Sequence, residues 1–267
     1  MINKTLTAGF ICFALFVSVF FMSGQAGIYF NATAFLVVFS GTLGAAFMSA
    51  GPRKIRQSLL FASRSYQEEP WRQKKLVDAL MSLGHLHRRH GIVSPASVQD
   101  MFPVAARGLE LVKDGYSEAE IKEIMASEAR SHYLSRQELE KVFRNMAAYA
   151  PSFGVAGSVI GLVGLLMGIE ETSMILKSIP ITLVSTLYGI TLANFLFLPV
   201  AEKIRQEADL ETREREIILC AMVAMTRKAD FLKLQRMLNA MVSDPQCRVE
   251  DSGAFRRISA RLKAENA

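Results

Sequence analysis

The sequence predicts an all-α membrane protein with four transmembrane helices and a helical cytoplasmic domain. Long uncharged stretches predict the spans, and helical apolar periodicity in a charged segment predicts the cytoplasmic part. Apolar residues make up 51% of the 267 residues and the mean hydropathy is +0.22, both high for a soluble chain. We expect four segments: a two-helix hairpin over 1–50, a cytoplasmic helical domain over 51–150, a second helix pair over 151–201, and a cytoplasmic helix with a basic tail over 202–267.

The first uncharged stretch runs from Thr5 to Pro52. A straight helix of that length would measure roughly 70 Å, more than twice the ~30 Å hydrocarbon core of a bilayer. The chain must therefore turn once, and the polar, glycine-containing SGQAG at 23–27 is the expected turn between spans over about 5–22 and 29–50. A cleaved signal peptide ending at Ala26 is the alternative, and it would leave three spans and an outside N-terminus.

Two more uncharged stretches, 145–169 and 178–201, each have about the ~20 residues that a spanning helix needs. They predict spans over about 152–169 and 179–199. Most lysines and arginines near the membrane fall on one side of all four spans: Arg53, Lys54, Arg56, Lys141, Arg144, Lys203 and Arg205. The opposite side has only Lys177, in a short loop with Glu170 and Glu171. Both termini should therefore be cytoplasmic. This distribution accounts for the net charge of +6 without a nucleic-acid partner.

The charged segments outside the spans are expected to be helical. Four leucines at helical spacing predict a first helix: Leu76, Leu80, Leu83 and Leu86. Gly91 is its expected stop, and Pro95 and Pro103 mark an irregular link. Ser117 and Glu120 form a capping-box pattern that opens a long helix toward the third span. After the fourth span we expect a charged helix, then an amphipathic one, then a basic tail suited to anionic lipid.

Glycines repeat within the third predicted span at spacings of three and four residues, although glycine is a poor helix former. At about 100° per residue they form one bare stripe on the helix: Gly154, Gly157, Gly161, Gly164 and Gly168. The fourth span carries a related stripe of small residues: Thr182, Ser185, Thr186, Gly189 and Ala193. Small residues let helix backbones approach closely in lipid, so we expect these stripes to make tight helix contacts.

Four hydroxyl side chains lie on or beside these stripes: Ser158, Thr182, Ser185 and Thr186. They either only pack helices or border a path for water or a small cation, because hydroxyl and backbone oxygens replace part of a hydration shell. An ion-translocating protein normally holds a carboxylate within the membrane, and no predicted span contains one. If ions cross, the titrating group must come from another chain.

Two prolines stand where cytoplasmic helices meet spans, Pro151 in AYAPSFG and Pro199 in FLFLPVAEK. Each removes a backbone hydrogen bond and favours a kink. They form either static bends or joints through which events in the membrane move the cytoplasmic part.

Residues 145–206 resemble the signature of MotA/PomA-type flagellar stator subunits, in the wider MotA/TolQ/ExbB proton-channel family. The motifs are AYAPSFGVAGSVIGLVGLL and LVSTLYGITLANFLFLPVAEKIR. The resemblance implies a multi-pass protein of the bacterial inner membrane, with five copies around a MotB/PomB-like partner. That partner has a single span with an ion-binding aspartate and a part that binds peptidoglycan. Proton or sodium flow would then turn the pentamer against a switch-ring protein of the FliG type, driving motility and chemotaxis.

The resemblance also assigns roles to residues. Pro151 and Pro199 match the family's two hinge prolines, and Thr186 matches the threonine that faces the partner's aspartate. Ser158 and Ser185 fall where sodium-driven members have threonine and many proton-driven members have alanine, so the driving ion stays open. For contact with the rotor the resemblance points to Arg88 and Arg89, although the acidic residue expected several positions later is missing from GIVSPAS.

Other classes predict different features. A TolQ/ExbB-like energiser of envelope work is the alternative, but such proteins usually have three spans. The chain has no HExxH, no Walker-type loop and no paired intramembrane aspartates, so we expect neither an enzyme nor a cofactor. In HLHRRH, His85 and His87 stand two apart on a helix and do not share a face, which argues against a metal site. The cysteines lack metal spacing and are expected as free thiols: Cys12, Cys220 and Cys247. A passive scaffold would tolerate loss of the hydroxyls.

Overall fold

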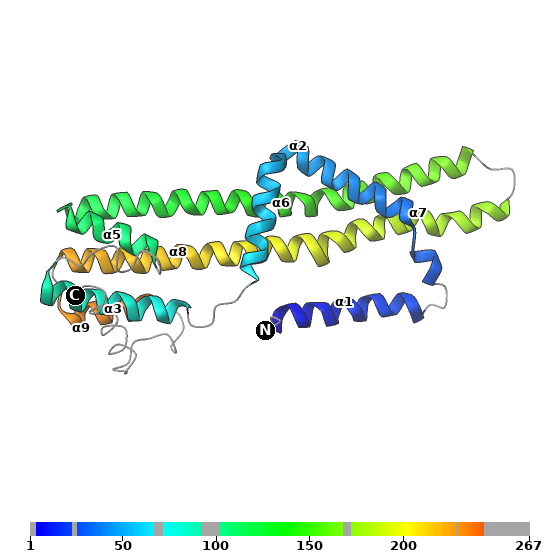
Figure 1. Cartoon of the computed structure of the whole chain (residues 1–267). Coiled ribbons are helices and arrows are strands. Elements are labelled where there is room, and N and C mark those ends of the chain that lie inside the picture. The colour runs from blue at the N-terminus through cyan, green and yellow to red at the C-terminus, as the bar shows by residue number, and fades with distance from the viewer. Residues whose placement is uncertain are drawn as a thin grey trace. The chain divides into compact units, whose positions relative to one another are not determined.

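The computed structural model describes residues 4–22, 26–66, 72–91, 102–167, 172–227 and 229–242, and every regular element in these ranges is helical (Figure 1). The predicted all-α fold class is therefore confirmed. The elements are α1 (Lys4–Met22), the 3-10 helix η1 (Ala26–Tyr29), α2 (Ala32–Ser65), α3 (Arg72–His90), α5 (Pro103–Lys113), α6 (Glu118–Met167), α7 (Thr172–Leu192), the π-helix η2 (Ala193–Phe197), α8 (Leu198–Thr226) and α9 (Phe231–Met241).

The helices form two compact units. The first comprises Met1–Glu68 and Arg136–Glu207, and the second comprises Glu69–Ser135 and Ala208–Ala267. The long helices α6 and α8 contribute residues to both. Each unit has its own cluster of buried apolar side chains.

The first unit contains the most apolar helices. Among the described residues, three helices are long and apolar enough to cross a membrane, Ala32–Ser65, Glu118–Gly164 and Thr182–Thr226, and α1 holds a shorter apolar stretch, Thr7–Val19. Many apolar side chains of α6 remain exposed, among them Val155, Val159, Ile160, Val163 and Leu166. An apolar exterior of this kind is typical of a chain covered by lipid or by other membrane helices. The described part of the chain is thus that of a membrane protein.

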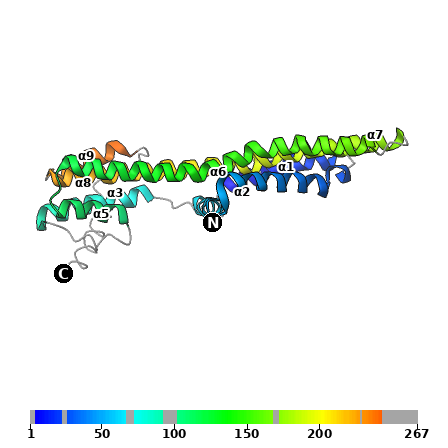
Figure 2. The ribbon, with the colours of Figure 1, turned by 90° about the horizontal axis from the view of Figure 1, so that it is seen from above.

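Helix α2 consists of two parts that meet at a sharp bend at Gly51. The backbone of Gly51 has φ 75° and ψ 158°, a conformation that side chains with a Cβ rarely adopt, and Pro52 follows it. The first part lies alongside α7, and the second part turns away from it (Figures 1 and 2). The bend coincides with the predicted end of the second span at residue 50.

The second unit packs the remaining helices around the leucines that the sequence predicts. Leu76, Leu80 and Leu83 are at most 1% exposed, and Leu86 is also buried. They face apolar residues of α5, the start of α6, the end of α8 and α9: Ala105, Leu109, Ile121, Met125, Ile217, Ala221, Met222, Leu234 and Leu238. The helical period of the leucines thus identified the inner face of α3.

Two of the predicted helix boundaries in the second unit are confirmed. Gly91 has φ 80° directly after α3, and its N–H donates to the carbonyl of His87 at 3.1 Å. The capping box is present: the Ser117 N–H donates to Glu120 Oε2 at 2.8 Å, and the Glu120 N–H donates to Ser117 Oγ at 3.4 Å.

The expectation of an irregular link through Pro103 is wrong. Pro103 is the first residue of α5, where a missing N–H costs nothing because that position has no intrahelical acceptor. Ala105 and Leu109 bury the inner face of this helix in the core. Proline ends helices, but it also favours the first position of a helix, and Pro103 occupies that position. Pro95 lies outside the described residues.

Candidate functional site

The glycine stripe of α6 lies directly against α7. A Cβ built on Gly154 would stand 3.0 Å from the Ser185 carbonyl oxygen, and one on Gly161 would stand 2.6 Å from Thr182 Cγ2. A Cβ on Gly157 would overlap the Ser185 hydroxyl. Side chains at these positions would therefore force the two helices apart.

One glycine of α7 makes the reverse contact. A Cβ on Gly189 would overlap the carbonyl oxygen of Ala150 and stand 3.0 Å from Pro151 Cα. Both are backbone atoms, which cannot swing aside. At Gly164, by contrast, no described atom lies within 4 Å of the Cβ position, and Gly168 lies outside the described residues. The closest approach of α6 and α7 is thus at the Pro151 end of the stripe.

A pair of hydroxyls bridges the same contact. The Oγ of Ser158 lies 2.8 Å from Thr186 Oγ1, 2.7 Å from the Thr182 carbonyl oxygen and 3.1 Å from the Gly154 carbonyl oxygen. Each hydroxyl has one proton to donate. When the Thr186 hydroxyl donates to Ser158 Oγ, the Ser158 hydroxyl is free to donate to the Thr182 carbonyl oxygen. The two hydrogen bonds then measure 2.8 Å and 2.7 Å. Two hydroxyl and two carbonyl oxygens therefore converge at one point between the helices.

The hydroxyl of Ser185 is in a different situation. The residue is 1% exposed, and its Oγ has no hydrogen-bond partner among the described residues. It sits in the space that the bare Gly157 provides, next to Val37 of α2. A buried hydroxyl without a partner costs about 1–3 kcal/mol, and a ligand that contacts this oxygen would offset that cost.

The oxygens of this cluster suit the coordination of a small cation or a water. Ser158 and Thr182 are 8% and 6% exposed, and Thr186 is half-buried. No carboxylate occurs in the uncharged stretches around them, and the described residues contain no group of histidine, cysteine or acidic side chains that could hold a metal ion. The cluster offers neutral oxygen ligands but no titrating group of its own.

The two prolines occupy dissimilar backbone settings. Pro151 lies inside α6, which continues without a break from Glu118 to Met167. Pro199 follows the π-helix η2 in the first turn of α8. Pro199 has no N–H, so in an α-helix the carbonyl four residues before it would have no hydrogen-bond donor. In a π-helix each carbonyl pairs with the N–H five residues later, which avoids this loss. No sequence pattern predicted this π-helix, and the role of the two prolines as bends or joints stays a prediction.

Sequence reasoning missed Tyr188 of α7. Its hydroxyl donates to the Tyr29 carbonyl and accepts from the Asn31 N–H, at 3.0 Å in the second case. Asn31 caps α2 through its side chain, which accepts from the Ala34 N–H. Tyr188 therefore fixes the start of α2 against the helix that carries Thr186. A tyrosine in an apolar stretch gives little sequence signal for such a contact.

Charged pairs surround the bend of α2 and the nearby part of α6. Lys54 lies 2.9 Å from Glu138, and this contact lowers the pKa of the Glu138 carboxyl. Arg144 pairs with Glu140 and, at 3.1 Å, with Glu202 of α8, and both contacts raise the pKa of its guanidinium. Several of the cations that indicated the topology are thus paired within the chain.

The expected rotor residues lie in the second unit. Arg88 is exposed on α3 and pairs with Asp230, which precedes α9, and this hydrogen bond lowers the pKa of the Asp230 carboxyl. Arg88 thus has an acidic partner 142 positions away in the sequence. The side chain of Arg89 lies outside the described residues.

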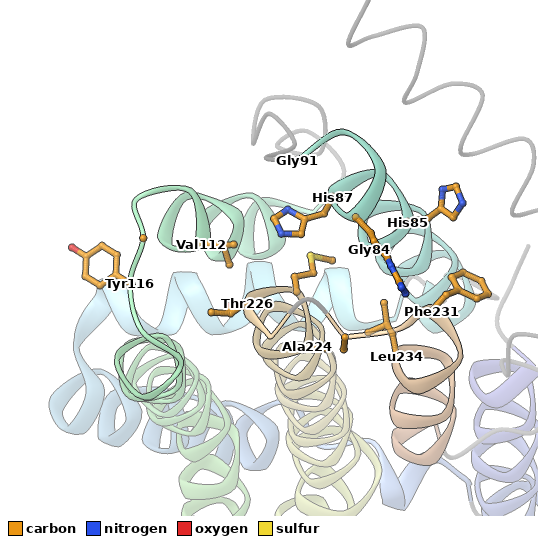
Figure 3. Close-up of a pocket in the computed structure, with 14 residues that line it drawn as sticks. Gly84, His85, His87, Gly91, Val112, Tyr116, Ala224, Thr226, Phe231 and Leu234 are labelled. Carbon is orange, nitrogen blue, oxygen red and sulfur yellow. The ribbon is translucent and has the colours of Figure 1, made fainter.

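A cavity of about 700 Å³ adjoins this pair, between α3, the end of α5, the end of α8 and α9. Figure 3 shows His87 turned toward Val112 and His85 on the other side of α3, near Phe231. The ring centroids of His85 and Phe231 are 6.2 Å apart in an edge-on contact. The two histidines thus do not converge on one point.

Comparison with known proteins shows which families the chain is similar to. Residues 97–217 match the model of the MotA/TolQ/ExbB proton channel family. The chain is 28% identical to YtxD of Bacillus subtilis, an uncharacterized protein, over 74% of each chain. It is also 28% identical to motility protein A of Treponema phagedenis, over 80% of this chain and 83% of that protein. The chain therefore resembles the MotA/TolQ/ExbB proton channel family, through the model match over 97–217 and the relatives of the motility protein A type.

The MotA branch of this family fits the chain best. A solved structure of C. jejuni MotAB superposes with a TM-score of 0.84, covering 94% of this chain and all of that one at 18% identity, which shows a shared fold. The family model covers the glycine stripe, the hydroxyl cluster, Pro151 and Pro199. The resemblance to MotA-type proteins that the motifs predict is therefore confirmed, and the TolQ/ExbB alternative is less well supported.

Proposed function

We propose that the chain is a MotA-type stator subunit of a flagellar motor, which converts ion flow into torque together with a MotB-like partner. The relatives named motility protein A support this function, and so does the fold shared with MotAB. In this function the chain binds and guides ions but performs no catalysis of its own. No cofactor is required beyond the transported proton or sodium ion.

The observation that carries the proposal is the hydroxyl cluster between α6 and α7, which contains oxygen ligands without an acid. Ser158 and Thr186 contact each other at 2.8 Å, and Ser185 has a buried hydroxyl with no partner among the described residues. The partner's single span brings the aspartate that loads and unloads the cation, and Thr186 faces it. Ser158, Thr182 and Ser185 complete the ion path. Serine in place of threonine or alanine fits either proton or sodium.

The working assembly has five copies of this chain in the bacterial inner membrane. Each copy crosses four times, with α1 as the first span and both termini in the cytoplasm. The apolar exteriors of α1 and α6, with Phe10 73% and Leu166 67% exposed, are available for lipid, the neighbouring copy and the partner. The glycine stripes keep α6 and α7 close enough to act as one wall of the ion path.

The cytoplasmic helices transmit movement to the rotor. Pro151 stands at the tightest approach of α6 to Gly189, and Pro199 follows a π-helix, so both junctions respond to small shifts in the hydroxyl cluster. Arg88 and Arg89 contact the switch-ring protein, and Asp230 provides the negative charge beside Arg88. The chain drives a flagellar rotor, through a switch-ring protein of the FliG type.

Replacing Thr186 tests the ion path. Thr186→Ala removes a hydroxyl that contacts Ser158, so we expect motility to be lost or severely reduced while the complex still assembles. Thr186→Ser restores the hydroxyl and should recover most of the swimming speed. Thr42→Ala is the control, because the buried Thr42 hydroxyl donates only to Val38 of its own helix. Normal swimming of the Thr186→Ala strain would exclude an ion-path role.

A further inference from the structure

The second part of α2, Pro52–Ser65, presents one face to its own unit and another to its surroundings. The inner face buries Ile55, Ser58, Phe61, Ala62 and Ser65. The outer face exposes two leucines, Leu59 at 56% and Leu60 at 53%. It also exposes three arginines: Arg53, Arg56 and Arg64. An amphipathic helix normally buries its leucines, so we expect something outside the chain to cover Leu59 and Leu60.

The three arginines have no acidic partner within the described part of the chain. Lys54, on the same helix, is the contrasting case, because it pairs with Glu138 at 2.9 Å. The segment from 52 to 65 contains no aspartate or glutamate. The outer face is therefore a strip of uncompensated positive charge with two apolar side chains within it.

Contacts with α6 show which side of this helix points toward the membrane. Lys54 contacts Glu138, and the Phe61 ring lies 4.0 Å from the Arg136 guanidinium carbon. Both α6 residues precede the uncharged stretch that begins at Asn145, so this side faces away from the membrane. At 100° per residue from Lys54, Arg56, Leu59 and Ser63 lie about 140–180° around the helix, Leu60 about 120°, and Arg53 and Arg64 about 80–100°. With the proposed span of α6, the side of Arg56 and Leu59 faces the membrane, and Arg53 and Arg64 flank it.

We propose that Pro52–Ser65 is a membrane-surface helix that binds anionic phospholipid, with Arg53, Arg56 and Arg64 on the headgroups and Leu59 and Leu60 at the boundary with the acyl chains. The inference rests on the proposed membrane span of the first part of α2, which the Gly51 bend joins directly to this helix. Guanidinium groups bind phosphate oxygens in a bidentate way, and leucine insertion supplies the apolar contribution.

Charge favours lipid over a face-to-face contact with a second copy of the chain. If the outer faces of two copies met, three unpaired arginines of one copy would face three of the other, and like charges repel. A bilayer with anionic headgroups offers both the opposite charge and an apolar layer at the depth of the leucines. The surface is thus complementary to a lipid leaflet rather than to itself.

The test is thermal melting of the full-length chain, purified in neutral detergent and titrated with phosphatidylglycerol or phosphatidylcholine. We expect phosphatidylglycerol to raise the melting temperature much more than phosphatidylcholine does, and high salt to reduce the difference. The triple variant Arg53→Gln, Arg56→Gln, Arg64→Gln should bind phosphatidylglycerol about fivefold more weakly for each arginine removed. A control with the same charge change in the second unit, Lys113→Gln, Arg130→Gln, Lys233→Gln, should respond like the unmodified chain.

Three results would overturn the inference. The first is an equal response to both lipids, and the second is a triple variant that responds like the unmodified chain. The third concerns the double variant Leu59→Ser, Leu60→Ser, which should weaken the response to lipid without changing the number of copies measured by native mass spectrometry. A change in that number would mean that the face packs against another copy. Neither readout depends on ion flow, so the result is independent of the motility test on Thr186.

Discussion

At the scale of the residue, the contact between α6 and α7 depends on atoms that are missing. Gly154, Gly157 and Gly161 on one helix and Gly189 on the other leave space in which backbone and hydroxyl groups of the facing helix lie. Ser158 can reach the Thr182 carbonyl on α7 because the helices are this close. Small side chains and polar contacts are therefore parts of one arrangement, in which the first permits the second.

The glycines differ in how well they should tolerate a methyl group. Gly189→Ala places a Cβ against the backbone of Ala150 and Pro151, so we expect it to destabilise the chain by about 1–3 kcal/mol and to impair assembly. Gly164→Ala is the matched control, because no described atom lies within 4 Å of its Cβ position. The melting temperature and native mass of the purified variants measure both effects. Equal behaviour of the two variants would contradict the proposed role of Gly189.

At the scale of the element, the first turn of α6 is tied to the end of α8. The Arg227 guanidinium donates two hydrogen bonds of 2.5 Å to the Glu118 carboxylate, and Lys122 donates another. These contacts lower the pKa of Glu118 to about 2, with the Arg227 hydrogen bond as the largest cause. The carboxylate also lies at a helix N-terminus, where negative charge is favourable.

This pair should make the second unit sensitive to acid. Because the folded-state pKa of Glu118 lies below its ordinary value of 4.5, its stabilising effect is present above about pH 4.5 and is lost as the pH falls toward about 2. Arg227→Gln removes most of that effect. The difference in melting temperature between the unmodified chain and this variant should therefore shrink between about pH 5 and pH 3. Arg130→Gln is the control, and a pH-independent difference for Arg227→Gln would refute the assignment.

At the scale of the whole molecule, the proposed function makes the chain one part of an ion-conducting assembly. Its uncharged stretches hold oxygen ligands but no aspartate or glutamate. In the proposed function a second polypeptide therefore contributes the acid. The apolar exterior of the first unit fits the same conclusion, since a single copy leaves it uncovered.

This division predicts the behaviour of the isolated chain. Reconstituted alone in liposomes, it should not conduct protons or sodium above the rate of empty vesicles. Addition of the MotB-like partner should produce conduction, and a partner whose intramembrane aspartate is replaced by asparagine should not. Conductance is measured with a pH-sensitive or sodium-sensitive dye inside the vesicles. Full conduction by the isolated chain would show that it needs no external acid.

The sequence by itself determined the helical class, the inner face of α3 and the start of α6. The last two follow from local chemistry: the period of Leu76, Leu80 and Leu83, and the reciprocal bonds of Ser117 and Glu120. The family resemblance came from the motifs of 145–206 as a whole. Such signals are visible in sequence because the interacting residues lie within a few turns of one helix.

Only the tertiary structure decided which distant residues meet. The pairing of Arg88 with Asp230, the bonds of Tyr188 to the start of α2 and the close approach of Gly189 to Ala150 join positions far apart in the chain. No sequence pattern indicated the π-helix before Pro199 or the positive φ of Gly51. A sequence pattern reports the face that a helix offers, but the partner on that face depends on how the whole chain folds.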